Sequence, residues 1–416
     1  MPVPFAKRVL RPAYGGVSVH LRVAAVPERL IEQPPAFCQP DLPMMPLIDL
    51  VAGARPNFMK LAPVVHGLAA AGEVHFRIVH TGQHYDPLMT DVFFEELRIP
   101  PPDVHLDVGS GSHGAQTARI IERYEAHVME RRPSHTVVFG DVNSTVACAL
   151  AAVKLGVPVA HVEAGLRSFD RSMPEEINRV LTDAVADLLL VSEPSGVANL
   201  QREGVDESKI RLVGNVMIDT LLAQLPAARE RRTAARLGLD GRRYGFVTLH
   251  RPSNVDHPET LATLLHLLHE LGRKMPLVFA IHPRTVHAAT RMNLGSLVAA
   301  GQGELLCLGP QRYVDSLSLL AGAAVVLTDS GGLQEESSVL DVPCLTLREN
   351  TERPVTVTLG TSRLVGSDPS RIRAAFDDVL EGKWPHGQSI PLWDGKAGGR
   401  VAAELASWMR RPLSHA

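Results

Sequence analysis

The sequence lacks long apolar segments, an excess of charge of either sign, and paired cysteines. No apolar run approaches the roughly 20 residues that a helix needs to cross a bilayer, so a membrane span is not expected. A formal net charge of −3 excludes the basic field that is typical of nucleic-acid-binding proteins. What remains, 416 residues of which 45% are hydrophobic and 21% charged, indicates a globular chain with room for two domains.

The four cysteines are scattered singly along the chain, at Cys38, Cys148, Cys307 and Cys344. None has a neighbour at the spacing of metal ligands, and three lie in apolar segments. We therefore predict buried thiols in a reducing compartment, which favours a cytoplasmic location over a disulfide-stabilised secreted protein. No metal site is expected.

The first 44 residues differ in composition from the rest. They are rich in proline, carry scattered basic residues and show no sustained hydrophobic period. The uninterrupted apolar core of a signal peptide is missing. We interpret them as a disordered extension, or as residues that precede a true start at Met44 or Met45.

From residue 46 onward, short apolar runs alternate with amphipathic helical stretches. One set of strand-like runs lies at 47–52, 74–80, 135–140, 157–162 and 187–192, and a second set lies at 244–250, 275–282, 304–309, 323–329 and 342–347. Strands that alternate with helices predict parallel βαβ units. An Arg-rich helical stretch, 224–239, separates the sets. The prediction is an α/β fold of two doubly wound, Rossmann-like domains, 45–214 and 215–396, with an interdomain cleft.

One glycine motif invites a misleading interpretation. GSGSHG, at 109–114, matches the dinucleotide-binding pattern GxGxxG. That pattern belongs at the first strand-to-helix turn of a βαβ unit, whereas this segment follows the short and polar VHLDV. A glycine-serine loop is the better interpretation, and no nicotinamide cofactor is expected.

Polar residues follow the apolar runs of both sets. Asp141 and Glu163 end two runs of the first set, Glu175 opens a helix after a glycine turn, and His250 ends a run of the second set. Each has a structural alternative, such as a helix cap or a paired core histidine. Ligands of open α/β sheets bind at the carboxyl ends of strands, so together these residues predict one site.

The segment DSGGLQEE, 329–336, is suited to phosphate. Its glycines allow close approach to backbone N–H groups at a helix N-terminus. Arg55, Arg353 and His250 could neutralise further phosphate charge. The residues therefore predict a nucleotide diphosphate held by one domain, with its attached group facing the acids of the other.

The chain from about Met45 to its end resembles the non-hydrolysing UDP-N-acetylglucosamine 2-epimerases. The motifs that carry the resemblance occur in one order: GARPNFMK, TGQHYD, FGDVNST, HVEAGLRS, MPEEINR, VGNVMID, TLHRPSN, HPRT, TDSGGLQEE and RENTERPVTV. The resemblance implies a fold like that of glycosyltransferase type B enzymes, a final helix at about 397–409 that returns to the first domain, and a homodimer.

The resemblance also implies roles for particular residues. The catalytic positions are Asp141, Glu163, Glu175 and His250. The substrate-binding positions are Arg55, Lys60, Gln311, Ser330, Gly331, Gly332, Glu336 and Arg353. In this interpretation Arg167 and Arg179 orient the reactive acids Glu163 and Glu175, and Glu176 is an ordinary first-turn helix acid.

The chemistry that the resemblance implies is demanding. No carbonyl acidifies the hydrogen on carbon 2 of an N-acetylhexosamine, so the family eliminates UDP to give 2-acetamidoglucal and adds it back with protonation on the opposite face. That path needs groups for proton transfer and donors that stabilise the departing diphosphate. It needs neither NAD nor a metal ion.

Several alternatives stay open. The substrate could be UDP-2,3-diacetamido-2,3-dideoxyglucuronate; the enzyme could hydrolyse the glycal; or the fold could serve a UDP-sugar glycosyltransferase or a non-catalytic sensor. Two places also depart from the family pattern. Gln83 and His84 lie in GQHYDPLM, where regulated bacterial members have a differently spaced second glutamine and methionine, and Ser316 replaces a frequent phenylalanine near the uracil.

Overall fold

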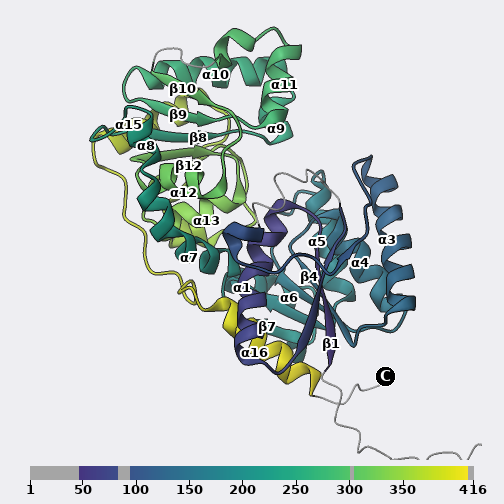
Figure 1. Ribbon diagram of the computed structural model, residues 1–416. Coiled ribbons are helices and arrows are strands. Elements are labelled where there is room, and N and C mark those ends of the chain that lie inside the picture. The colour runs from purple at the N-terminus through teal and green to yellow at the C-terminus, as the bar shows by residue number, and fades with distance from the viewer. Residues whose placement is uncertain (1–45, 83–93, 300–303, 411–416) are drawn as a thin grey trace, which may run out of the picture. The chain divides into compact units, whose positions relative to one another are not determined.

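The computed structural model of the chain describes residues 46–82, 94–299 and 304–410 (Figure 1). The predictions for residues 1–44, and those for Gln83 and His84, lie outside these ranges. The described residues form two parallel sheets with helices around them, which confirms the predicted α/β fold class.

The first sheet has seven strands in the order β3-β2-β1-β4-β5-β6-β7. The strands are β1 (Leu47–Ala52), β2 (His75–His80), β3 (Val104–His105), β4 (His135–Phe139), β5 (Val159–Ala164), β6 (Leu188–Val191) and β7 (Ile210–Leu212). The helices are α1 (Arg55–Ala71), α3 (His113–Glu130), α4 (Asn143–Lys154), α5 (Pro174–Val185) and α6 (Pro194–Arg202), with a short turn of 3₁₀ helix at Glu207–Lys209.

Successive residues of β1 pack on opposite faces of this sheet. Ile48 and Leu50 belong to one apolar cluster with residues of α1, while Val51 belongs to a second cluster with residues of α3 and α4. Because both faces are covered, most strand positions carry apolar residues, and the strands stand out as near-continuous apolar runs in the sequence. The buried Asp49 of β1 is an exception, and it is paired with Arg77.

The second sheet has six strands in the order β10-β9-β8-β11-β12-β13. They are β8 (Gly245–Thr248), β9 (Leu277–Ala280), β10 (Leu305–Leu308), β11 (Val325–Thr328), β12 (Cys344–Thr346) and β13 (Ser362–Leu364). The helices are α7 (Val216–Arg231), α8 (Thr233–Arg236), α9 (Pro252–Val255), α10 (Pro258–Gly272), α11 (Pro283–Arg291), α12 (Tyr313–Ala321), α13 (Gly331–Val339), α14 (Val355–Thr358) and α15 (Pro369–Leu380), with a 3₁₀ turn at Gly295–Val298.

The strand order reverses direction between β1 and β4 in the first sheet and between β8 and β11 in the second. At such a switch point the loops after the two strands diverge to opposite faces and leave room for a ligand. Asp141 follows β4, which borders the first switch point, and Glu163 lies at the end of the next strand, β5. His250 and Ser330 follow β8 and β11, the two strands that border the second switch point. The topology therefore supports the prediction of a site at the carboxyl ends of the strands.

Three edge strands were not predicted from the sequence. β3, β7 and β13 contain only two or three residues each, too few to give an apolar run. β5 also ends two residues later than predicted, so Glu163 lies within the end of the strand and not after it. The segment GSGSHG joins β3 to α3, and its last two residues begin that helix.

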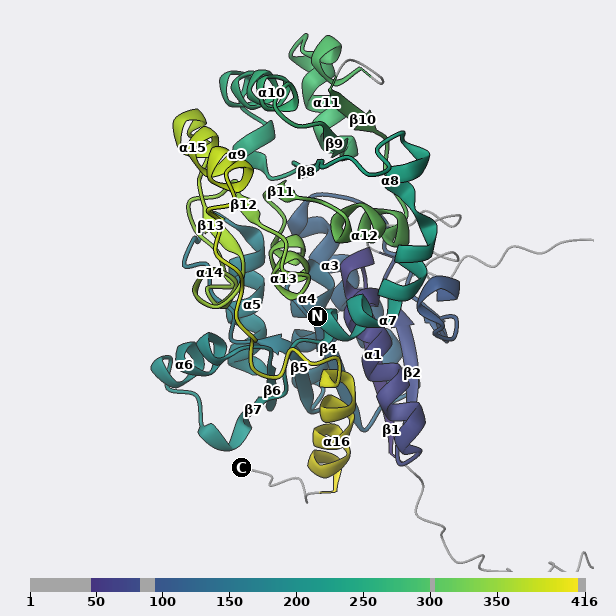
Figure 2. The same cartoon turned by 90° about the vertical axis from the view of Figure 1, so that its left-hand side faces the viewer.

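The last described helix, α16 (Ala397–Met409), packs against α1, and Figures 1 and 2 show the two side by side. Two glycines permit the close approach. A Cβ atom on Gly398 would lie 2.3 Å from the carbonyl oxygen of Pro63, and one on Gly67 would lie 2.6 Å from that of Gly398. Asp219 of α7 accepts the N–H groups of Ala397 and Gly398 and so fixes the start of α16. The domain boundary at residues 214 and 215 stays a prediction.

Among the described residues, no helix has the length and apolar character required for a membrane crossing. Cys148, Cys307 and Cys344 are buried free thiols, as predicted. Burial raises the pKa of each of them, to about 11 for Cys307.

Gly398→Ala should lower the thermal unfolding midpoint, because its Cβ would overlap the Pro63 backbone and push α16 away from α1. Overpacking of this kind costs about 1–3 kcal/mol. The matched control is Gly399→Ala, since a Cβ there meets nothing within 4 Å. Alanine is the better helix former by up to about 1 kcal/mol, so this control should be neutral or stabilising. Equal midpoints in calorimetry for the two variants would contradict the close packing of α16 on α1.

Candidate active site

Glu163 occupies a strained position at the end of β5. Its φ angle is 76°, in the left-handed region that few residues other than glycine adopt, and the pairing of β5 with β6 shifts register between Val162 and Ala164. A bulge of this kind re-aims a side chain, and such strain costs about 1–3 kcal/mol unless function or packing requires it. The carboxylate that results is buried.

Two cations hold the Glu163 carboxylate. Nζ of Lys60, from α1, lies 2.6 Å from Oε2, and Nη2 of Arg353 donates to Oε1 at 3.0 Å. In the described part of the chain no hydrogen bond of normal geometry reaches Oε2, so the Lys60 contact is mainly Coulombic. A Cβ on Gly140, whose φ is 64°, would lie 2.6 Å from Nζ, so glycine is required there. The structure thus brings together three of the predicted site residues, Lys60, Glu163 and Arg353.

Arg353 is fully engaged by carboxylates. Nε donates to Glu335 and Nη1 to Glu352, each at 2.5 Å, in addition to the bond from Nη2 to Glu163. Burial alone would lower the pKa of Arg353, but these charges raise it well above its usual value. A Cβ on Gly331 would lie 2.6 Å from Nη1, so the first residue of α13 packs directly on the guanidinium. The predicted diphosphate turn and Arg353 are therefore adjacent.

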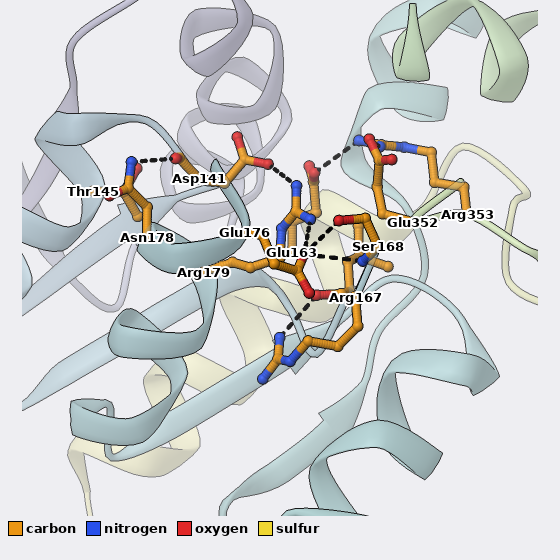
Figure 3. Close-up of polar contacts among 12 residues, drawn as sticks. Asp141, Thr145, Glu163, Arg167, Ser168, Glu176, Asn178, Arg179, Glu352 and Arg353 are labelled. Atoms are coloured by element: carbon orange, nitrogen blue, oxygen red, sulfur yellow. Dashed lines mark hydrogen bonds and ion pairs between the residues drawn. The ribbon is translucent and has the colours of Figure 1, made fainter. Parts of the chain in front are cut away.

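Asp141 belongs to a second ion-pair network (Figure 3). Arg179 donates from Nη2 to Asp141 and from Nη1 to Glu176, each at 2.5 Å. Burial alone would raise the pKa of Asp141, but the charges of Arg179 and Lys60 lower it below its usual value. Asp141 is therefore an ionised carboxylate whose charge is coupled to the cation that holds Glu163.

Glu176 does more than stabilise the first turn of α5. It is buried, and its carboxylate accepts the N–H and hydroxyl of Ser168 and the N–H of Phe169. It therefore fixes the loop after β5 and, through Arg179, the position of Asp141. The sequence alone identified it only as a first-turn helix acid.

The prediction that Arg167 orients the reactive acids is wrong. Its guanidinium forms ion pairs with Asp183 and Glu203. Asp183 in turn accepts the N–H of Gly165 and contacts His161 at 2.6 Å. Arg167 thus stabilises the turn after β5 through Asp183. The prediction for Arg179 is also wrong in its partners, which are Asp141 and Glu176 and not Glu163 or Glu175.

Glu175 is half-buried in the first turn of α5. Within the described ranges it has no hydrogen bond or ion pair, and its charge contributes to raising the pKa of Arg284. The structure therefore does not join it to Asp141 or Glu163 by a contact. The side chain of Arg55 lies outside what the structure describes, so its predicted contact is not tested.

His250 is positioned by a buried aspartate. Asp329 accepts the N–H groups of His250 and Arg251 and the side-chain amide of Asn254, and it lies 2.9 Å from Nδ1 of His250. Burial alone would raise the pKa of Asp329, but the hydrogen bond and charge of His250 lower it. The imidazole is 35% exposed, so it remains open to a ligand.

Glu336, the predicted ribose contact, is buried and accepts a hydrogen bond of 2.9 Å from Tyr313. Burial raises its pKa to about 7. Gln311 bonds to the carbonyl of Gly309, and the N–H of Ser330 bonds to Thr328. The side chain of Ser330 makes no capping hydrogen bond at the N-terminus of α13.

Sequence reasoning missed three buried acids around Arg353: Glu193, Glu335 and Glu352. Glu352 also pairs with Arg348, four residues earlier, and that spacing was a signal in the sequence. Burial raises the pKa of Glu193 to about 7; one oxygen accepts the hydroxyl of Ser195, and the other has no hydrogen-bond partner in the described residues.

The comparisons with known proteins now decide the family. The family model described as UDP-N-acetylglucosamine 2-epimerase matches residues 66–406. The chain belongs to this family. The UDP-N-acetylglucosamine 2-epimerase of Methanocaldococcus jannaschii is 40% identical over 366 residues, which cover 86% of this chain and 98% of the relative.

Other members of the epimerase family differ in the substrate that they are named for. The UDP-2,3-diacetamido-2,3-dideoxy-D-glucuronate 2-epimerase of Pseudomonas aeruginosa is 39% identical, covering 86% of this chain and 98% of that protein. Among solved structures, the M. jannaschii enzyme in complex with UDP-GlcNAc and UDP is similar with a TM-score of 0.80 at 39% identity, covering 87% of this chain and 99% of that one. Such neighbours confirm the predicted glycosyltransferase type B-like fold.

The buried Glu193 gives a pH-dependent prediction. A carboxyl with a folded pKa of about 7 and an ordinary value of 4.5 contributes most to stability below pH 4.5. Between those values the unfolded chain has released its proton and the folded chain has not, so stability falls as the pH rises. Glu193→Gln has no proton to lose. Its stability relative to the natural chain should therefore rise by about 3 kcal/mol from pH 4.5 to 7.

Thermal or urea unfolding of both proteins at several pH values would measure this difference. Glu122→Gln, at an exposed position of α3, is the control for loss of a carboxylate. A pH-dependent change for Glu193→Gln no larger than that of the control would contradict the assignment.

Proposed function

We propose that this protein interconverts UDP-N-acetylglucosamine and UDP-N-acetylmannosamine by eliminating UDP and adding it back to the opposite face of 2-acetamidoglucal. The observation that carries the proposal is the contact of Lys60 and Arg353 with the Glu163 carboxylate, with the N-terminus of α13 packed on Arg353 and Asp141 in the neighbouring network. A diphosphate needs the positive groups, and proton transfer at carbon 2 needs the carboxylates.

The diphosphate is proposed to bind at Ser330, Gly331 and Gly332. These residues open α13, a nine-residue helix whose first turn contains no acidic residue. The positive end of a helix dipole and the charge of Arg353 both favour an anion at this point. Glu336 is proposed to hold the ribose hydroxyls, with Gln311 as a further nucleotide contact.

In the elimination, a carboxylate takes the proton from carbon 2, the C–H electron pair becomes the C1–C2 double bond, and the C1–O bond breaks as UDP leaves. Lys60, Arg353 and the helix N-terminus stabilise the departing diphosphate. Re-addition reverses these steps, with protonation of carbon 2 on the other face. Asp141, Glu163, Glu175 and His250 are proposed as the proton-transfer and charge-stabilising groups, and no hydride transfer is involved.

A second substrate is supported by one specific observation. The relative named for the diacetamido glucuronate sugar is as similar to this chain as the one named for UDP-N-acetylglucosamine, at 39% and 40% identity. A homodimer, a cytoplasmic location and the domain boundary at 214–215 are further parts of the proposal. The buried free thiols support the location, since reduced cysteines are typical of that compartment.

Proton NMR of UDP-N-acetylglucosamine with the protein in D₂O tests the reaction directly. We expect UDP-N-acetylmannosamine with deuterium at carbon 2, because the proton returned comes from a group that exchanges with solvent. Free N-acetylmannosamine plus UDP would indicate a hydrolysing enzyme. An unchanged spectrum, from protein that binds UDP, would reject this substrate in favour of the diacetamido glucuronate sugar.

Asp141→Asn and Glu163→Gln should each reduce turnover by at least about 10²-fold, the typical contribution of one positioned proton-transfer group. Neither should lose UDP binding, since both replace a carboxylate by an amide of the same shape. Steady-state kinetics and calorimetry measure the two effects, with Glu122→Gln as the control. Loss of UDP binding in both variants would reduce these residues to structural roles.

A further inference from the structure

Glu163 is the counter-ion of the cations to which the proposed function assigns the diphosphate. Its carboxylate contacts Lys60 at 2.6 Å and Arg353 at 3.0 Å. Within the described residues it has no other hydrogen bond or ion pair. Gly331, at the start of α13, packs on the same guanidinium. The Glu163 carboxylate therefore lies between two cations, one of which packs against a helix N-terminus.

The carboxylate itself has little freedom to move. Its backbone is held in the left-handed region at the register shift of β5, and its side chain is buried. The following turn is fixed in addition by the hydrogen bond from Gly165 to Asp183. A ligand that enters must therefore change the partners of the cations more than the position of Glu163.

Arg353 can change one partner and keep its place. Nε and Nη1 are held by Glu335 and Glu352, and Glu352 is itself held by Arg348. Nη2 is the nitrogen that faces Glu163. Lys60 contacts the carboxylate without an aligned hydrogen bond, so no directional bond among the described residues holds its ammonium to Glu163.

We propose that the diphosphate replaces Glu163 as the partner of Lys60 and Arg353, so that nucleotide binding itself releases this carboxylate for proton transfer. The inference rests on the proposed diphosphate site and adds a role for Glu163 before any chemistry. When the cations turn to the phosphate, the Glu163 carboxylate loses both of its partners, and it does so only when the nucleotide is present.

Other charged groups lie around this exchange. They are Asp141 and Arg179 in the neighbouring network, Glu335 and Glu352 on Arg353, Arg348 and Arg251 on Glu352, and Glu193 near Arg353. The charge of Lys60 also lowers the pKa of Asp141 and opposes the rise in the pKa of Glu335. The test must therefore isolate Glu163 from the general effect of adding a phosphate charge.

Calorimetric titration of UDP and of uridine at pH 8 provides that test. Removing an internal anion that competes for the same cations should strengthen UDP binding, so Glu163→Gln should bind UDP about tenfold more tightly than the natural chain. Its affinity for uridine, which has no phosphate, should be unchanged. Glu122→Gln, at an exposed position of α3, is the control for the loss of a carboxylate, and its UDP affinity should stay within about twofold.

Glu163→Asp is the second variant and decides the question if the glutamine variant does not fold. It keeps the charge, is one methylene shorter and suits a left-handed backbone better than glutamate. Its UDP affinity should lie between those of the natural chain and Glu163→Gln. Unchanged or weaker UDP binding by the folded Glu163 variants, with normal uridine binding, would overturn the exchange and leave the proposed function standing. Absence of UDP binding by the natural chain would overturn both.

Discussion

The pairing of the Glu163 carboxylate with Lys60 and Arg353 is the interaction on which the rest of the site depends. It joins β5 and α1 of the first sheet to a loop that follows β12 of the second. All three groups are buried, and removing one partner of such a pair typically costs about 3–5 kcal/mol because it leaves an uncompensated charge. Gly140 and Gly331 make room for the two cations, and the backbone of Glu163 accepts strain to reach them.

Several buried acids hold in place the groups that are proposed to take part in the reaction. Asp329 fixes the loop that carries His250, Glu176 fixes the loop after β5 together with Arg179, and Asp183 fixes the turn that follows Glu163. Each accepts backbone N–H groups that would otherwise be unsatisfied in the interior. The reactive groups thus keep their geometry before any ligand arrives, which is what electrostatic stabilisation of a leaving diphosphate requires.

Most of the fold was predictable because both sheets are covered on two faces. That arrangement favours apolar residues at most strand positions, so strands such as β1 and β11 are evident as apolar runs in the sequence. The edge strands β3, β7 and β13 were missed because two or three paired residues produce no pattern. The site was predictable in outline, since polar residues after such strands must gather at one edge. Arg167 shows the limit: it lies four residues after Glu163, yet its charge is turned to Asp183 and Glu203.

The sequence by itself determined the two sheets, the helix N-terminus at Gly331 and the kinds of side chain that reach the carboxyl ends of the strands. The sheets and the helix N-terminus depend on local hydrophobic period and glycine placement, which are short-range properties of the chain, and the kinds of side chain are evident from the motifs themselves. Only the tertiary structure decided which carboxylate meets which cation. Glu163 and Arg353 are 190 residues apart, and Asp141 and Arg179 are 38 apart. Contacts at such separations depend on how the sheets, the bulge in β5 and the anchoring acids place each group, and no local pattern in the chain contains that information.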